Sequence, residues 1–120
     1  LLNLIDKDYI KSAHDISLGG LITALSKMCI KGNKGIKINK TKNLISEIEY
    51  YFSEDQGRYL IEIDPKDFEK VTAILDKNSV HHEKLGIIVD KDMIINEKTK
   101  VTIDELKSYN TNWLTNYMSA

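Results

Sequence analysis

The sequence has little of several residue types that mark particular classes of protein: one cysteine, one proline and one tryptophan in 120 residues. A single cysteine excludes an internal disulfide framework and fits a reducing compartment. Because Cys29 falls on an apolar helical position, we expect a buried thiol and not a nucleophile. No apolar run approaches the ~20 residues of a membrane helix, and no signal-peptide pattern is present. We therefore expect a cytoplasmic protein that does not bind membranes.

Neither sign of charge is in large excess. The 17 Lys and Arg residues are nearly balanced by 18 Asp and Glu residues, which gives a formal net charge of −1. The lysines are scattered and are not interleaved with aromatic residues, so nucleic-acid binding is not expected. A hydrophobic content of 42% and a charged content of 29% are ordinary for a globular chain. The length suits a single domain spanning residues 1–120.

Periodicity predicts a mixture of helices and strands. Helices are predicted over 1–11, over 43–52 and over 65–77, the last with Asp64 as N-cap. Another begins at Gly20, with Gly32 as its C′ glycine. A final helix begins at Ile103, after a capping box formed by Thr102 and Glu105. Strands are predicted at 36–38, 59–63, 85–89 and 93–95, the last two joined by a tight turn at 90–92. The expected fold is α+β, an α/β sandwich with a mixed sheet layered with helices.

The most informative stretch is SAHDISLGGL at 12–21, read as a polar turn at 12–17 that leads into two glycines and a helix. Adjacent glycines let the backbone approach a ligand or another segment closely. Free N–H groups at the following helix start favour an anion, although a packing or turn device is the more common use of such glycines. His14 and Asp15 form an acid–base pair, part of a metal site or a structural turn. Adjacent side chains rarely converge on one proton, and no third ligand lies nearby at metal-like spacing, which favours the structural role.

A second motif, FSEDQGRYLIEI at 52–63, places an acceptor-rich loop directly before a clean strand. Glu54, Asp55 and Gln56 suit sugar hydroxyls, an amidine or a metal-bound water. Arg58 is able to clamp a phosphate, but a surface or interdomain salt bridge explains it equally well.

Together these two motifs resemble the paired signatures of the C-terminal domain of the aminoimidazole-ribonucleotide synthetase superfamily. Within it they are most similar to the last domain of the large subunit (subunit II) of the phosphoribosylformylglycinamidine synthase family, as is the ending from Val101 through Trp113 to Met118. The resemblance implies a fold like that superfamily's C-terminal domain, partly ferredoxin-like. It implies a domain of an ATP-dependent ligase of purine biosynthesis that makes formylglycinamidine ribonucleotide from formylglycinamide ribonucleotide and glutamine-derived ammonia.

The resemblance also implies ATP and Mg²⁺ for the complete enzyme, with neither held tightly by this chain, and no catalytic residue or metal ligand here. Its partners would be the preceding domains, a glutaminase subunit and a small bridging subunit. The family uses this domain type twice, and the later copy frames a non-catalytic pseudo-site. The corresponding substrate- or phosphate-facing residues are His14, Asp15, Ser17, Gly19, Gly20, Glu54, Asp55, Gln56 and Arg58.

Two departures from the family pattern favour a scaffolding role over anion binding. Leu18 stands where an Asp is usual, and Asp55 stands where a Ser is usual. The alternative is a structural or interaction module of the same fold that binds no ligand.

Three further features carry expectations. His81 and His82 are expected to be solvated loop residues and not metal ligands. Tyr109, Trp113 and Tyr117 form an aromatic stripe that suits a core or interdomain face better than base stacking. The apolar opening, with Leu1, Leu2, Leu4 and Ile5 and no initiator Met, suggests a C-terminal fragment of a longer enzyme, inactive alone and with apolar surface left uncovered.

Overall fold

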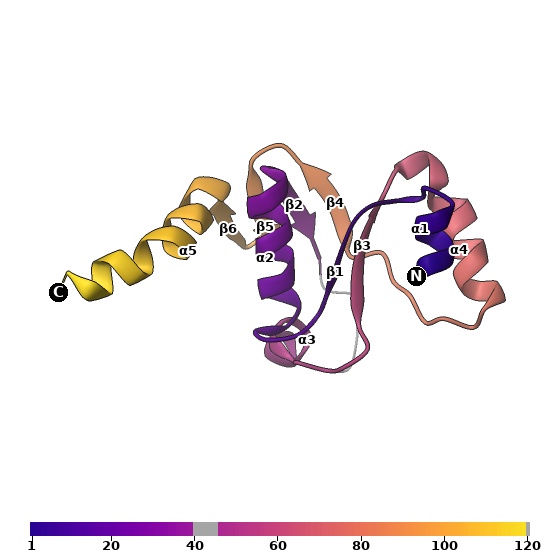
Figure 1. Cartoon of the computed structure of the whole chain (residues 1–120), viewed down its shortest axis with the longest axis horizontal. Helices are drawn as coiled ribbons and strands as arrows, with labels where there is room; N and C mark the ends of the chain where they lie inside the picture. Colours follow the sequence, from indigo (N-terminus) through magenta and orange to yellow (C-terminus); the bar gives the residue numbers. More distant parts are fainter. Residues whose placement is uncertain (40–45, 120) are drawn as a thin grey trace.

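The computed structural model describes residues 1–39 and 46–119, which form two sheets and five α-helices (Figure 1). The helices are α1 (Leu2–Asp6), α2 (Gly20–Gly32), α3 (Glu47–Phe52), α4 (Phe68–Lys77) and α5 (Ile103–Met118), with a 3-10 turn, η1 (Pro65–Asp67), before α4. The strands are β1 (Ile10–Asp15), β2 (Gly35–Ile38), β3 (Tyr59–Ile63), β4 (Gly86–Val89), β5 (Asp92–Ile95) and β6 (Thr99–Thr102). The predicted mixed α+β class is confirmed.

The larger sheet has the strand order β4-β2-β5-β6, with β2 and β5 parallel and the other pairs antiparallel. Helix α2 supplies much of the core on one side of this sheet, where Leu21, Leu25 and Cys29 are buried together with Ile36 and Met93. The spacing that predicted α2 and β2 is therefore the spacing of the buried face.

The strands predicted at 85–89 and 93–95 do not form a hairpin around the predicted tight turn. That part of the prediction is wrong, because β2 lies between β4 and β5. The connection crosses the start of β2 at Gly35, where a Cβ would lie 2.2 Å from the backbone oxygen of Asp92. Only a residue without a side chain allows this close approach. Strand β6 was also missed, because its sequence, TKVT, has only one apolar residue.

The first helix is shorter than predicted, and the predicted polar turn at 12–17 is wrong over most of its length. Residues Ile10–Asp15 form β1, which pairs antiparallel with β3 in a two-stranded ribbon. The inward positions of β1 include Ser12 and His14 in place of apolar residues, so the strand lacks the usual alternation of hydrophobicity. Pairing with β3, distant in sequence, supplies the backbone hydrogen bonds that make it a strand.

The helix ends match the sequence predictions in part. Asp64 caps η1 through Lys66 N, and Thr102 and Glu105 form the predicted capping box of α5. Helix α3 begins at Glu47 behind a second capping box at Ser46, and the predicted residues 43–45 lie outside the described residues. The left-handed residue that ends α2 is Asn33, with φ of 51°, and not Gly32, which is the last helical residue.

Helices α1 and α4 lie together at the far end of the ribbon, away from α2 (Figure 1). Leu4 and Val71 are buried there outside the main core cluster, whereas Phe68, Ile74 and Leu75, predicted to be buried, are only half-buried. Leu1, Leu2 and Ile5 remain exposed, as expected for an uncovered apolar face. The fold thus consists of a main layer, a small satellite and a ribbon that joins them.

Candidate functional site

The structure brings the two sequence motifs together at one end of the β1–β3 ribbon. Asp15 pairs with Tyr59 and His14 pairs with Leu60 in the antiparallel register. The pairing continues beyond the strands, where Ile16 N donates to the carbonyl oxygen of Arg58 at 2.9 Å. The glycine turn after β1 and the loop 53–57 before β3 therefore face the same region.

The two glycines of the turn are required by its geometry. Gly19 and Gly20 have φ of 82° and 69°, in the left-handed region that side chains disfavour. A Cβ on Gly20 would lie 2.6 Å from the carbonyl carbon of Phe52. The paired glycines therefore let the start of α2 lie directly against the end of α3.

The expected anion position at this turn is taken by a side chain of the protein. Gly19 N donates a 2.7 Å hydrogen bond to Oε1 of Glu54. A carboxylate at the start of a helix makes the interaction that a bound phosphate would make there. A phosphate ligand at this amide would have to displace Glu54.

Arg58 is also engaged within the loop. Its Nη1 donates to Ser53 Oγ at 3.0 Å and lies 3.4 Å from Oδ2 of Asp55, and Ser53 Oγ donates to the same carboxylate at 2.9 Å. Asp55, which departs from the family pattern, thus supplies the acceptor that holds Arg58. Because both side chains are partly exposed, the pair contributes little stability, and its main effect is to orient the loop.

The remaining predicted site residues do not converge on one point. The Nδ1 of His14 pairs with the carbonyl oxygen of its neighbour Asp15 and lies 3.4 Å from that residue's carboxylate, consistent with a structural role. Ser17 and Gln56 are exposed. Ser53 and Phe52 also belong to this region, Ser53 through its hydrogen bond from Arg58 and Phe52 through the contact of its backbone with Gly20. No local sequence pattern indicates either contact.

A metal centre is not visible in the described part of the chain, since no group of three or more His, Cys, Asp or Glu residues in 1–39 and 46–119 is placed to hold an ion. His81 is exposed, as predicted, and His82 is half-buried, with Nδ1 3.0 Å from the carbonyl oxygen of Val80. Likewise, none of the helices among these residues is long and apolar enough to cross a membrane.

The thiol of Cys29 is buried, as predicted. Burial, reinforced by the nearby carboxylate of Glu62, raises the pKa of Cys29 to about 11. Glu62 itself accepts a 2.7 Å hydrogen bond from Ser12 Oγ across the ribbon. The thiol therefore stays protonated at neutral pH, which does not suit a nucleophile.

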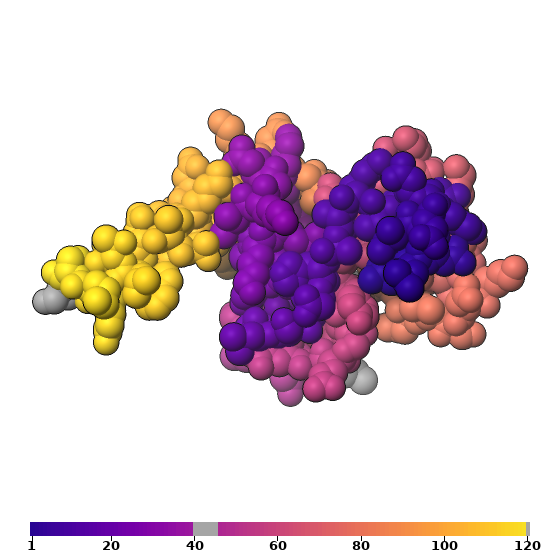
Figure 2. Space-filling model, viewed as in Figure 1, coloured from indigo at the N-terminus to yellow at the C-terminus, as the bar shows by residue number. Residues whose placement is uncertain are grey.

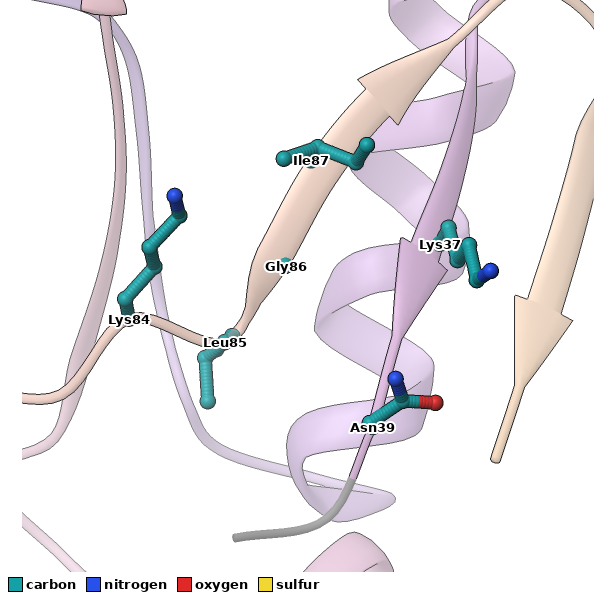
Figure 3. A pocket seen from close by; sticks show the side chains of 6 residues that line it. All are labelled: Lys37, Asn39, Lys84, Leu85, Gly86 and Ile87. Atoms are coloured by element: carbon teal, nitrogen blue, oxygen red, sulfur yellow. The ribbon is translucent and has the colours of Figure 1, made fainter. Parts of the chain in front are cut away.

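A separate hollow of about 320 Å³ lies between β2 and the segment that leads into β4 (Figure 3). It is lined by Lys37, Asn39, Lys84, Leu85, Gly86 and Ile87. Lys37 Nζ pairs with Glu97 at 2.9 Å, and Lys84 Nζ lies 5.5 Å from the ring centroid of Phe68. The two lysine side chains point apart (Figure 3), so they do not form a joint anion site.

Comparison with known proteins gives a consistent result. Residues 1–96 match the family described as AIR synthase related protein, C-terminal domain. The phosphoribosylformylglycinamidine synthase subunit PurL of Pelagibacter ubique (strain HTCC1062) is 59% identical over 118 residues, which cover 98% of this chain and 16% of that protein. The PurL of Thermococcus sibiricus is 40% identical over 84 residues, covering 67% of this chain and 12% of that protein. The chain thus spans less than a fifth of the length of these curated relatives.

Solved structures show the same fold. T. maritima PurL complexed with ATP has a TM-score of 0.75 and 18% identity, covering 88% of this chain and 20% of that one. The same protein complexed with FGAR has a TM-score of 0.75 and 19% identity, covering 88% and 19%. A structure of PurLQS from Thermotoga maritima also has a TM-score of 0.75 at 18% identity, covering 88% and 20%.

Proposed function

Because the chain belongs to the family of AIR synthase related protein C-terminal domains, we propose that it is the C-terminal domain of a phosphoribosylformylglycinamidine synthase. The 59% identity to the Pelagibacter ubique PurL over 118 residues supports this assignment. The complete enzyme would convert formylglycinamide ribonucleotide, ATP and ammonia derived from glutamine to formylglycinamidine ribonucleotide. In that reaction ATP activates the amide oxygen, and ammonia then displaces the activated oxygen.

Within that enzyme, we propose that this domain acts as a scaffold and not as a ligand site. The observation that carries the proposal is the hydrogen bond from Gly19 N to Glu54, which engages an amide that a phosphate at this turn would use. Arg58, the cation of the same site, is engaged by Ser53 and Asp55. The second candidate, a structural module outside any ligase, rests on the same hydrogen bond but leaves the identity to PurL unexplained.

ATP and Mg²⁺ belong to the proposal for the complete enzyme only. Solved T. maritima PurL structures are described as complexed with ATP and ADP. Two observations support assigning both groups to the rest of the enzyme: the Gly19 amide donates to Glu54, and no cluster of three metal-binding side chains is present among residues 1–39 and 46–119. We therefore assign no catalytic step to this chain, and its proposed contribution is to position the neighbouring domains.

The proposed partners are the preceding domains of the enzyme, a glutaminase subunit and a small bridging subunit. The PurLQS structure from Thermotoga maritima provides the parallel for the two subunits. The balanced charge supports a domain without nucleic-acid or membrane partners, and the free thiol of Cys29 is compatible with the cytoplasm.

A chimera tests the assignment to the enzyme. The segment of Pelagibacter ubique PurL that matches this chain is replaced by residues 1–120, and formylglycinamidine ribonucleotide synthesis is measured with ammonium chloride as nitrogen source, which bypasses the glutaminase. We expect activity within about tenfold of the parent, and a truncated parent without the segment serves as control. A folded chimera as inactive as the truncated parent would contradict the assignment.

Titration calorimetry separates the scaffold from a binding domain. The 120-residue chain is titrated with ADP and with formylglycinamide ribonucleotide, and we expect no binding heat at millimolar ligand. Binding at micromolar concentration that is lost in Arg58→Ala would show that the site is open to ligands.

A further inference from the structure

The first turn of helix α5 packs against the main core, and the rest of the helix projects away from it. Ile103 is buried and Leu106 packs against the main core, while Lys107 Nζ donates to the side chain of Asn33 at 2.6 Å. Beyond this point the helix extends away from the other elements as an arm (Figures 1 and 2).

The projecting part carries an exposed apolar face, which we call the α5 stripe. Its members are Tyr109, Trp113, Leu114, Tyr117 and Met118, which are 77%, 62%, 52%, 75% and 76% exposed. At the 100° per residue of an α-helix, the three aromatic residues, four positions apart, lie on one side. Large aromatic side chains in such a row are typical of the core of a protein interface.

The same part of the helix has no charge. Residues 108–119 contain no Asp, Glu, Lys or Arg, although charged residues make up 29% of the chain. Asn, Thr and Ser, which fill the other positions, are weak helix formers. A short helix of this composition is marginal in water without tertiary packing, so the projecting part needs a partner surface.

The partner surface can be inferred from how much of its relatives the chain covers. The family match ends at residue 96, before α5 begins. The match to the Pelagibacter ubique PurL includes 118 of the 120 residues, so it extends over α5, yet it covers only 16% of that protein. More than four-fifths of such a polypeptide is therefore available to cover the stripe.

We propose that the α5 stripe docks in an uncharged apolar groove on the preceding part of the same polypeptide, an inference that rests on the proposed function. Permanent interfaces are more hydrophobic than transient ones, so this uncharged aromatic face favours an intrachain contact over a transient partner. Without Lys or Arg beside the aromatic residues, the stripe has nothing to attract anionic lipid or nucleic acid.

Alanine variants on opposite sides of the helix test the proposal in the chimeric PurL described above. The stripe variant is Tyr109→Ala with Tyr117→Ala, and the control is Thr111→Ala with Thr115→Ala, which lie opposite the three aromatic residues of the stripe. Both raise helix propensity, so neither acts by weakening the helix itself. Chymotrypsin cleavage after Trp113, followed by mass spectrometry, reports whether the helix is covered.

We expect cleavage at Trp113 to be at least tenfold slower in the chimera than in the 120-residue chain. The stripe variant should lose that protection, and the control should keep it within twofold. An active chimera in which Trp113 is cleaved as fast as in the 120-residue chain would overturn the docking proposal while leaving the proposed function intact. A folded but inactive chimera would instead contradict the proposed function.

A second measurement uses the only tryptophan of the chain. The 120-residue chain labelled with 5-fluorotryptophan gives one ¹⁹F resonance, which we expect to shift when PurL truncated before the matching segment is added. The dissociation constant should rise at least tenfold in the stripe variant. If the resonance instead responds only to the chain's own concentration, and sedimentation shows a dimer that the stripe variant abolishes, a second copy is the occupant and the proposal is wrong.

Discussion

At the residue scale, the glycine turn shows how two backbone positions determine the contact between α2 and α3. We expect Gly20→Val to lower the free energy of unfolding by about 1–3 kcal/mol, because a left-handed φ and a clash with Phe52 both penalise a β-branched side chain. Gly19→Val should cost a similar amount, since its Cβ would lie 2.3 Å from Oγ1 of Thr23. Urea denaturation followed by circular dichroism measures both.

Gly32→Ala is the matched control for this prediction. Apart from the two adjacent residues and the backbone of the same helix, no atom of the described residues lies within 4 Å of a Cβ at Gly32, so the variant should be neutral or stabilised by up to about 1 kcal/mol. Unfolding curves of the Gly19 and Gly20 variants that overlay the wild type would contradict the assigned role of the turn.

The buried thiol gives a prediction about pH. The folded pKa of Cys29 is raised from 9.0 to about 11, so the folded state holds the proton more tightly than the unfolded chain. The resulting stability is fully present below pH 9 and is lost as the pH rises through 11. We expect Cys29→Ala to show a smaller loss of stability than the wild type between these two pH values, measured by urea denaturation.

Reactivity toward a disulfide reagent provides an independent check on Cys29. The native protein at pH 8 should react at least tenfold more slowly than the urea-unfolded chain, because both access and thiolate formation are suppressed. Equal rates in the two states would show that the thiol is not buried.

At the scale of elements, Glu54 joins the loop before β3 to the start of α2. We expect Glu54→Ala to lower the free energy of unfolding by about 1 kcal/mol, because the Gly19 amide loses its acceptor. Sulfate should restore part of this loss by occupying the vacated position. Thermal melts with and without sulfate measure both effects.

The neighbouring Gln56→Ala is the control for Glu54, since Gln56 is exposed in the same loop. It should be neutral and should respond to sulfate as the wild type does. Sulfate stabilisation of the wild type equal to that of Glu54→Ala would show that the carboxylate does not close the site.

The start of α5 makes a prediction at acid pH. The backbone N–H of Thr102, and then its hydroxyl, donate to Glu105 and lower the pKa of that carboxyl below its ordinary value of 4.5. The helix is therefore stabilised above pH 4.5, and this contribution is lost as the pH falls through the lowered pKa. Circular dichroism should show a loss of helix on acidification that is smaller in Glu105→Gln.

At the scale of the whole molecule, the chain is more extended than a compact domain. Its radius of gyration of 15.7 Å exceeds the roughly 13.6 Å expected for 120 residues. The satellite of α1 and α4 and the arm formed by α5 account for the difference (Figure 2). Both leave apolar side chains exposed, as a domain that packs against neighbours would.

The activity of the isolated chain follows from this organisation. We expect no formylglycinamidine ribonucleotide from the 120-residue chain with ATP, formylglycinamide ribonucleotide and ammonia, because under the proposed function the ATP and Mg²⁺ sites lie in the rest of the enzyme. Product formation above the level of a heat-denatured sample, measured by mass spectrometry, would contradict the scaffold role.

Several elements could be predicted from the sequence because local interactions specify them. Helix α2, strand β3, the Asp64 cap and the Thr102–Glu105 capping box were all predicted, because their periodicity and hydrogen bonds involve residues close in sequence. The two motifs were found in the same way, since each is a continuous run of residues.

The tertiary structure brings together segments that are distant in the sequence. It made a strand of Ile10–Asp15 by pairing it with Tyr59–Ile63, and it placed β2 between β4 and β5 where a hairpin was predicted. It also placed the carboxylate of Glu54 on the amide of Gly19, 35 residues away. Such pairings depend on backbone groups and side chains far apart along the chain, and no local sequence pattern specifies which of them will be in contact.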